Sequence, residues 1–562
     1  MQDAFCRTRN DQSPNFPPTL PADQKRGIPF GLRIMKRSIL TVLVLLLESS
    51  FLLAQDRSKP VKITLGNGSP SVYGRAVMFA IDERSFPATR GVMLKMERPS
   101  KHAKNPVLPR GKKGAPDALA VSSPAVVLEN GNWRMWYASN ATPDYPKGRV
   151  AYAESDDGVH WTKPELGLVE FRGSKENNLV DAEPGLCWTV SVLHDPQAPA
   201  DRRYVMTGED MRFWGDSGGW SLARRSSVTR IDVSSDGLHW RSLRKSHGII
   251  QQQNETHTIY KFGGFYHLGG HQISPLLKLP MQEHPLGGYR GPRTFVVWRS
   301  PVLDRWTVEH TKAFYKPMRS SSPYRKGWDR EEVHLGASVT AFDSVCLGIY
   351  GQWHHPINEG DPEYVAKSVS CDLGLLISND GLHFHEPAPG STFIQRDQEL
   401  RWDRSFRDNK DKDNLLLDHG SIITTKRETF IYYSATTPGG NISGIHSNIG
   451  LATLPRDRFG YLQVIPGTPG DGHVVSCPVT VSGDVGLVIN SEVSEGATIQ
   501  AELLDENGHA VLQHYEAVAV TSGLDSPVRW PGKSRVPRGQ PFRIRLRLGG
   551  EAKLYAAYLR SE

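Results

Sequence analysis

The sequence has little of several features that would place it in a familiar class. Its apolar runs fall short of the ~20 residues of a membrane-spanning helix. No apolar pattern with a 3.6-residue period is long enough to predict an extended helix. No stripe of basic residues interleaved with aromatic ones indicates a nucleic-acid surface. We therefore expect no stable membrane span, no nucleic-acid partner and no helical domain.

Cysteine is also scarce, with 5 in the whole chain. Their spacings match no zinc motif, so a structural zinc site is not expected. Cys346 and Cys371 should lie on neighbouring strands of one hairpin. A disulfide between them, which an exported protein can form, and two free buried thiols are both consistent with that position.

What the sequence does contain favours short strands joined by tight turns. Glycine (53) and proline (39) are plentiful, while 38% of the residues are hydrophobic and 23% are charged. Turn-forming residues at this density are typical of all-β proteins. A chain of 562 residues exceeds the ~250–300 at which a single core stops growing, which predicts at least two domains.

The N-terminus has the pattern of a secretory signal. Residues 1–34 form a polar, proline-containing extension, and we interpret Met35 as the true start. A basic Lys36-Arg37, the apolar run Ile39–Leu47 and the small Ala54 then predict a signal peptide over residues 35–54. A buried strand behind a disordered tail is the alternative. The expected location is secreted or periplasmic.

Removing residues 1–54 takes away seven Lys/Arg and four Asp/Glu, so the net charge falls from +7 to +4. This mild excess is consistent with a solvated basic surface or with an acidic or sulfated glycan as ligand.

An internal repeat is the strongest signal in the chain. Three segments follow β-rich runs and share the pattern Ser-x-Asp-Gly-x-His-aromatic, and two degenerate copies complete the set. The five terminal aromatic residues are spaced 66 to 79 residues apart: Trp161, Trp240, Trp306, Phe384 and Phe459. Asp-Gly supplies the positive φ angles of a tight turn, and the Ser and Asp side chains cap backbone amides. These residues are therefore predicted to be structural.

A second hydrophobic hairpin lies upstream of each turn and supplies the first strands of each unit. Five units of about four strands predict a five-bladed β-propeller over residues 95–466, which hides its sheet edges by radial repetition. Residues 55–94 form a leading segment, and the region 55–120 is expected to add a strand that closes the ring. After a Gly/Pro-rich boundary, the alternating runs of residues 473–562 predict a C-terminal β-sandwich.

The turns, the strand Trp133–Tyr137 and the segment Lys104–Leu108 together resemble the five-bladed glycoside hydrolases of families 32, 43 and 130. A propeller followed by a β-sandwich is also the layout of family 32. Two local matches are sharper. Glu255–Leu268 is similar to the third blade of family 43, where a Glu opens the innermost strand as general acid. Asp418–Ser421 is similar to the fifth-blade His-Gly-Ser of that family, which implies that His419 approaches a cation or its waters on the propeller axis.

The sequence also departs from these families. Ser123-Pro124 replaces the first-blade Asp-Pro that supplies a carboxylate in families 32 and 43, and Leu186–Thr189 has no acid at the second blade. The Asn-Asp-Pro-Asn, Arg-Asp-Pro and Glu-Cys motifs of family 32 are absent. The family mechanism therefore cannot be carried over as a whole.

Glycoside cleavage needs two carboxyl groups facing the scissile bond, ~5–5.5 Å apart for retention or ~6.5–9.5 Å for inversion. The candidates at the starts of innermost strands are Glu255, Glu332 and Asp418, with Glu331 beside Glu332. Asp117 and Asp181 precede blades 1 and 2 and could reach in from loops. We predict Glu255 as general acid, with Glu332 or Asp418 as its partner. Each acid could instead be a solvated loop carboxylate.

A sugar also needs apolar faces and hydrogen-bond donors. Trp353, His354 and His271 follow second strands of their blades and are predicted to line a substrate site, with ordinary loop packing as the alternative. The resemblance requires no cofactor and allows a structural cation near His419, which could equally be a packing residue.

Two functions are consistent with the sequence: a secreted glycosidase that uses paired carboxyl groups on an oligo- or polysaccharide, and a non-catalytic carbohydrate-binding propeller. A sialidase-type enzyme is a third, weaker interpretation, because no residue separates Asp from Gly in the turns.

Overall fold

The computed structural model describes residues 60–561 except 143–147, 186–188, 211–227, 244–249, 252–254, 274–281, 284–288, 291–292, 308–310, 317–328, 357–369, 397–415 and 438–445. The chain divides into two compact units, Met1–Pro60 and Val61–Glu562. The predictions for residues 1–34 and 35–54 fall outside the described residues, so the account below concerns the second unit. Within that described part, no helix is long and apolar enough to cross a membrane.

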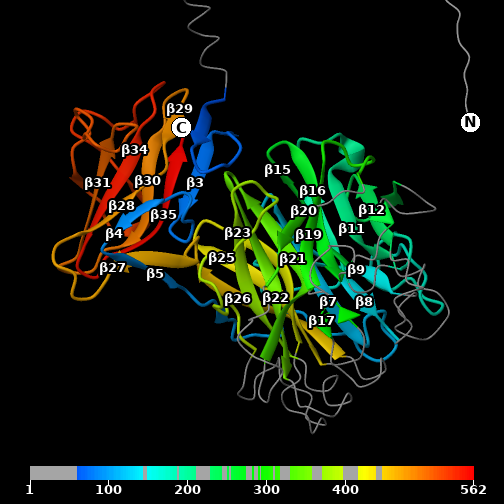
Figure 1. Ribbon diagram of the computed structural model, residues 1–562. Helices are drawn as coiled ribbons and strands as arrows, with labels where there is room; N and C mark the ends of the chain where they lie inside the picture. Colours follow the sequence, from blue (N-terminus) through cyan, green and yellow to red (C-terminus); the bar gives the residue numbers. More distant parts are fainter. Residues whose placement is uncertain are drawn as a thin grey trace, which may run out of the picture. The chain divides into compact units, whose positions relative to one another are not determined.

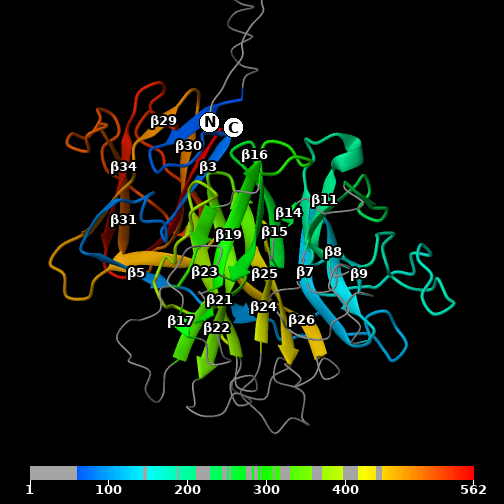
Figure 2. The ribbon, with the colours of Figure 1, turned by 45° about the vertical axis from the view of Figure 1, so that its right-hand side comes forward.

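Five β-blades make up the propeller, and the first strand of each blade faces a common central cavity. Figure 2 shows the strands of blades 3 to 5 side by side. Blade 1 contains β7 (Ala120–Glu129), β8 (Asn132–Asn140) and β9 (Arg149–Ser155). Blade 2 contains β10 (Ser191–His194), β11 (Tyr204–Asp210), β12 (Val228–Ser234), β13 (Arg241–Ser242) and β14 (Ile250–Gln251), with a 3-10 helix, η2 (Ala200–Arg202). Blade 3 contains β15 (Glu255–Phe262), β16 (Phe265–Ile273), β19 (Arg293–Ser300) and β20 (Thr311–Phe314), with the small hairpin β17 (Gln282–Glu283) and β18 (Tyr289–Arg290). Blade 4 contains β21 (Asp329–Phe342), β22 (Val345–Pro356) and β23 (Ser370–Ser378), and blade 5 contains β24 (Leu416–Thr424), β25 (Glu428–Thr437) and β26 (His446–Pro455).

The ring closes through the N-terminal part of the chain. The strand β6 (Ser100–Lys101) pairs antiparallel with β26 as an outer strand of blade 5, and Leu108 bridges Ile449 beyond it. Residues before blade 1 therefore complete blade 5. The fourth strands of blades 1 and 4 are shorter than predicted and are present as isolated bridges, such as Leu373 to Ile394.

A separate hydrophobic cluster lies between each pair of neighbouring blades, which accounts for the five-fold ring. Each cluster joins buried side chains of two blades: Trp136 and Tyr204 for blades 1 and 2, Val205 and Trp298 for 2 and 3, Phe295 and Tyr350 for 3 and 4, Leu375 and Tyr433 for 4 and 5, and Tyr432 and Met135 for 5 and 1. Burial of this apolar surface is the main force that holds the blades together.

The repeated turn has the structural role that the sequence predicts. In blade 1, Asp157 Oδ1 accepts hydrogen bonds from the N–H groups of Val159 and His160, each at 2.8 Å, and Gly158 has a φ of 76°. The Gly158 carbonyl accepts a hydrogen bond from the Tyr432 hydroxyl of blade 5 at 2.6 Å. The corresponding carbonyls of Gly237 and Gly381 accept hydrogen bonds from Trp136 and Tyr260 of the preceding blades. The motif therefore links neighbouring blades.

The β-sandwich is built from both ends of the described chain (Figure 1). The sequence assigned residues 55–94 to a leading segment, whereas strands from this region pair with C-terminal strands. The strand β27 also belongs to the sandwich, although it lies within residues 95–466, the range predicted for the propeller. One sheet contains β3 (Arg75–Phe79), β5 (Val92–Met96), β27 (Gly460–Val464), β30 (Gly486–Glu492), β33 (Gly523–Pro527) and β35 (Lys553–Arg560). A second contains β4 (Ala88–Arg90), β28 (Gly472–Val475), β31 (Thr498–Leu504), β32 (Val518–Ala519) and β34 (Arg543–Gly549), and a third contains β1 (Lys62–Leu65), β2 (Val72–Tyr73) and β29 (Val479–Val481).

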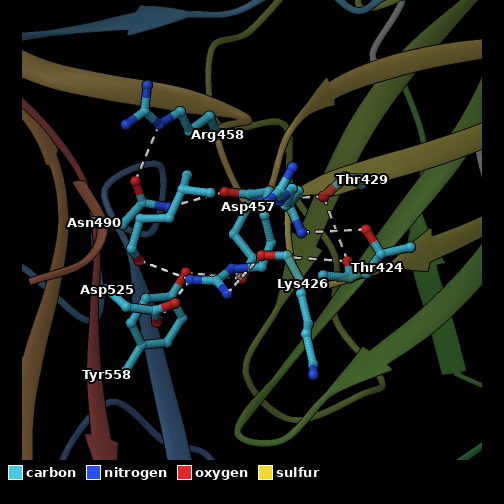
Figure 3. Close-up of polar contacts among 12 residues, drawn as sticks. Thr424, Lys426, Thr429, Asp457, Arg458, Asn490, Asp525 and Tyr558 are labelled. Atoms are coloured by element: carbon cyan, nitrogen blue, oxygen red, sulfur yellow. Dashed lines mark hydrogen bonds and ion pairs between the residues drawn. The ribbon is translucent and has the colours of Figure 1, made fainter.

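A polar junction joins the sandwich to blade 5 (Figure 3). Asp457, in the degenerate fifth copy of the turn, is 1% exposed and accepts a hydrogen bond from Tyr558 Oη at 2.8 Å. Arg456 Nη2 lies 2.7 Å from Asp525 Oδ1, and Arg458 donates to Asn490 at 3.1 Å. The far ends of the strands of blade 5 therefore dock on the sandwich.

Candidate functional site

Four innermost strands carry an irregularity at a similar point. Unpaired residues interrupt the register between Ser122 and Ala125 in β7, Thr256 and Thr258 in β15, His334 and Ala337 in β21, and His419 and Ile422 in β24. Bulges of this kind bend a strand and re-aim its side chains. They divide each strand into a starting segment, which forms one mouth of the ring, and a following segment, which lines the channel.

The channel is a cavity of about 430 Å³ lined by the first strands of all five blades. Its wall is held by hydroxyl groups that bridge neighbouring blades. Ser191 Oγ accepts a hydrogen bond from Ile259 N at 3.1 Å, Thr258 Oγ1 from Val339 N at 3.0 Å, and Ser421 Oγ from Val126 N at 2.9 Å. These contacts satisfy backbone N–H groups where adjacent inner strands diverge, and they fix the spacing of the strand starts.

The three predicted catalytic acids all lie in the starting segments of innermost strands. Glu255 opens β15 and its backbone pairs with His271. Glu332 lies in β21 opposite Trp353, and Asp418 lies in β24 opposite Ser434. The side chains of Glu255 and Glu332 are outside the described residues. Asp418 is 9% exposed, and its Oδ1 accepts a hydrogen bond from the His419 N–H at 3.0 Å.

Aromatic and basic side chains of blades 3 and 4 gather at the same mouth. The His334 and Trp353 rings have centroids 4.2 Å apart, and the Arg293 guanidinium lies 4.9 Å from the Trp353 ring. Arg293 Nη1 lies 3.0 Å from His334 Nδ1. Trp353 is 9% exposed, so these neighbours cover most of its surface. His271 is buried beside them in β16, while His354 has a described backbone in β22 and a side chain outside the described set.

His419 lines the channel cavity and its Nδ1 lies 2.7 Å from Ser338 Oγ of blade 4. The pKa of His419 is lowered to about 3, mainly by burial and to a smaller extent by the nearby His271, against a hydrogen bond to the His334 backbone that raises it. The imidazole is therefore neutral near pH 7. Among the described residues, no group of three or more His, Cys, Asp and Glu side chains could hold a metal ion. The cation predicted near His419 therefore stays a prediction.

Two further acids precede blades 1 and 2 in loops. The carboxylate of Asp117 has structural partners: Asp117 is 2% exposed and binds Lys163 Nζ at 2.6 Å and Tyr137 Oη at 3.0 Å. The backbone of Asp181 forms a bridge with His239, beside the turn of blade 2.

The cysteine pair is not bridged. Cys346 and Cys371 are free and buried, because Cys346 pairs with Ser378 whereas Cys371 pairs with Trp353 near the other end of the same hairpin. Burial raises the pKa of both thiols well above the ordinary value. The disulfide interpretation is therefore wrong.

Sequence reasoning missed His334 and Arg293. Aligning the blades at their bulges would have found His334, because His334-Leu335-Gly336 and His419-Gly420 occupy the same point of β21 and β24. Arg293 opens a third strand, and nothing in the repeat points to that position.

No family model matches the sequence. The chain is 30% identical over 141 residues to an uncharacterized protein of Mycobacterium tuberculosis, and 30% identical over 140 residues to its counterpart in a second strain. These matches span 24% of this chain and 38% of the length of the curated relatives.

Three solved structures to which the chain is similar are described as glycoside hydrolases. A glycosyl hydrolase from Bacteroides ovatus has a TM-score of 0.39 at 15% identity and covers 64% of this chain and 94% of its own. A second structure comes from family 130, a family of mannoside phosphorylases described as containing glycoside hydrolases that target β-1,2-mannosidic linkages in Candida mannan. It has a TM-score of 0.40 at 14% identity, and the match covers 65% of this chain and 97% of its own. The family 32 β-fructofuranosidase of Bombyx mori has a TM-score of 0.34 at 11% identity, and the match covers 82% of this chain and 93% of its own.

Proposed function

We propose that this protein is a secreted glycoside hydrolase that cleaves an oligo- or polysaccharide at the mouth where the innermost strands begin. The observation that carries the proposal is the placement of Glu255, Glu332 and Asp418 in the starting segments of three consecutive inner strands. Glycosidic cleavage requires two carboxyl groups that face one bond, and acids at the starts of consecutive inner strands are candidates for such a pair.

Glu255 is the proposed general acid. A general acid must be protonated when it donates to the leaving oxygen, and a partly desolvated carboxyl meets that need because desolvation raises its pKa. Its backbone pairs with the buried His271, so that part of the mouth is shielded from solvent. The partner carboxylate is Glu332 or Asp418. Asp418 accepts a hydrogen bond from the backbone N–H of His419.

The substrate is proposed to contact the group formed by Arg293, His334 and Trp353, together with His271 and His354. The guanidinium and imidazole groups supply donors for sugar hydroxyls. The Trp353 ring packs against both His334 and Arg293. In this arrangement Trp353 positions polar neighbours more than it offers a bare stacking face.

A non-catalytic carbohydrate-binding propeller is the second candidate. It is favoured by blade 1, where Ser122, Ser123 and Pro124 occupy the start of β7 and Ser123 has a φ of 49°. No carboxyl is present at that position.

A screen of the recombinant protein against plant and algal polysaccharides tests the proposal. For a cleaved substrate, Glu255→Gln keeps the shape of the side chain and removes its proton, so turnover should fall by about 10²–10⁴. Glu428→Gln is the matched control, because Glu428 is exposed at the opposite end of blade 5. Unchanged hydrolysis in Glu255→Gln would reject the assignment, and binding without cleavage in the unaltered protein would favour the second candidate.

A further inference from the structure

The outer face of the second sandwich sheet carries an unusual set of basic residues. Alternation along a strand places every second side chain on the same face. The register aligns Arg90 of β4 with His473 of β28, and His473 with Arg547 of β34. Arg547 is aligned in turn with Gln500 of β31. Arg545 lies on the same face, two residues from Arg547. We call Arg90, His473, Arg545 and Arg547 the basic face.

The basic face is turned away from the propeller. The inward residues of this sheet, including Val474, Leu546 and Ala501, belong to the sandwich core. In Figure 1, β30, β35 and β3 lie between this sheet and the blades. Arg90 is exposed, and the side chains of Arg545 and Arg547 are 22% and 34% exposed. The face is therefore accessible to a large ligand.

Positive charge exceeds negative charge here. Among the paired residues that the structure describes on this face, Glu502 is the one acid, and its side chain is 2% exposed beneath Arg545 and Arg547. It accepts hydrogen bonds from Arg545 Nε at 2.5 Å and Arg547 Nε at 2.7 Å. Each guanidinium carries further N–H donors beyond Nε, so Glu502 orients both arginines without using all of their donors.

The surroundings of His473 reflect the same field. Its pKa is lowered by burial and also by Arg547, Arg545 and Arg90, against the smaller effect of Asp471, which raises it. Three cations therefore act on one point in the middle of the row. Adjacent strands lie about 4.8 Å apart, so the row from Arg90 to Arg547 spans about 10 Å. This spacing suits a ligand with several anionic groups along an extended chain.

We propose that the basic face binds an anionic polysaccharide, whose carboxylate or sulfate groups pair with Arg90, Arg545 and Arg547. Guanidinium groups bind such oxyanions through paired, charge-assisted hydrogen bonds. The choice of a glycan over other polyanions rests on the proposed function, whereas binding itself requires no turnover. The basic face thus holds the polymer on the sandwich, separately from the mouth of the propeller.

Affinity electrophoresis of the full-length protein tests this proposal, with Glu255→Gln present so that no polymer is cleaved. Gels contain polygalacturonate, sulfated dextran, neutral glucomannan or double-stranded DNA. We expect polygalacturonate or sulfated dextran to retard the protein. Retardation by polygalacturonate would identify carboxylate as the recognised group, and retardation by sulfated dextran would identify sulfate. Arg90→Gln/Arg547→Gln should weaken binding by at least about tenfold, and added salt should weaken it further.

The control is Arg84→Gln/Arg529→Gln, which removes the same charge from two exposed arginines that are not on the basic face. An equal loss in this control, no retardation by either anionic polysaccharide, or stronger retardation by DNA would overturn the proposal. If the double variant fails to fold, Arg90→Glu changes one exposed residue and carries the same expectation. Loss of binding leaves hydrolysis of a short substrate unaltered, so failure here is distinct from failure of the proposed function.

Discussion

The two ends of blades 4 and 5 use polar residues in opposite ways. At the far end, polar groups are paired across the junction: Asp457 contacts Tyr558, and Arg456 contacts Asp525. At the mouth, Asp418 and His334 border the start of the channel and have neighbours such as Arg293 that could turn toward a ligand. Ionic groups at the first end fix the sandwich to the propeller, whereas those at the second end are proposed to act on a substrate.

The repeated turn shows how this division arises. In blades 1, 2 and 4 the Asp of the turn binds a following His side chain at the exposed surface, at 2.7 to 2.8 Å. In blade 5 the degenerate copy of the turn instead has Asp457 two residues before its aromatic Phe459, and Asp457 has a φ of 62° and is buried against the sandwich. The departure from the repeat therefore marks a docking point between domains.

The largest expected effect is at the junction. Asp457→Ala removes the acceptor of the buried Tyr558 hydroxyl and a partner of Arg456, and it places an alanine at a positive φ. It should cost about 3 kcal/mol in the free energy of unfolding, measured by urea denaturation at pH 7. Turnover at the mouth should be unchanged.

Asp457→Asn is the matched variant. Burial raises the pKa of Asp457, against Tyr558, Arg456 and Arg75, which lower it. Because the carboxylate charge is costly to bury, its loss in the Asn variant is partly offset. Asparagine also tolerates a positive φ. It should lose less than half as much stability as Asp457→Ala. Equal losses in the two variants would show that the hydrogen bond and the backbone angle are not what holds the junction.

An intermediate effect is expected on the pH dependence of stability. Burial alone would raise the pKa of Asp380, but hydrogen bonds from His383 and Leu382 lower it to about 2. A lowered folded-state pKa stabilises the protein above the unfolded value of 3.8, and this stabilisation is lost as the pH falls toward 2. Asp380→Asn should therefore have a lower free energy of unfolding than the unaltered protein at pH 7. The difference between the two free energies should shrink between pH 4 and pH 2. A difference that stays the same from pH 7 to pH 2 would contradict the proposed role of the hydrogen bonds to Asp380.

The smallest effect is predicted for the channel wall. Thr258→Val keeps the shape of the side chain and leaves the Val339 N–H without its acceptor, which should cost about 1 kcal/mol in thermal or urea unfolding. Thr340→Val is the control in the same cavity, because its hydroxyl lies 3.5 Å from the Ile422 carbonyl, too far for a strong hydrogen bond. A similar loss in both variants would mean that the hydroxyl bridges do not hold the blades.

The repeat made the fold predictable, because each turn is a local signal with its own chemistry. The pairing of residues 75–96 with C-terminal strands was not predictable in the same way. It depends on contacts between residues more than 360 positions apart, such as Val77 with Tyr558 and Met96 with Gly460, and a short alternating run does not reveal its partner strand.

The candidate site was predictable only in part. The acids at the strand starts follow from the position of each first β-run. The Arg293–His334–Trp353 group depends on how blades 3 and 4 pack together. The choice between a disulfide and two free thiols at Cys346 and Cys371 stayed open because sequence spacing does not fix the strand register that separates them. Packing between blades decides such contacts, and no local pattern encodes it.

The most direct test of the account compares leaving groups in Glu255→Gln, once the screen has identified the sugar. A natural linkage needs protonation of its leaving oxygen, whereas a dinitrophenyl glycoside does not. The account predicts that kcat/KM for the natural linkage falls by about 10²–10⁴, while cleavage of the dinitrophenyl glycoside stays within a few-fold of the unaltered protein. Equal losses for both substrates, or no loss for either, would contradict the assignment of Glu255 as the general acid.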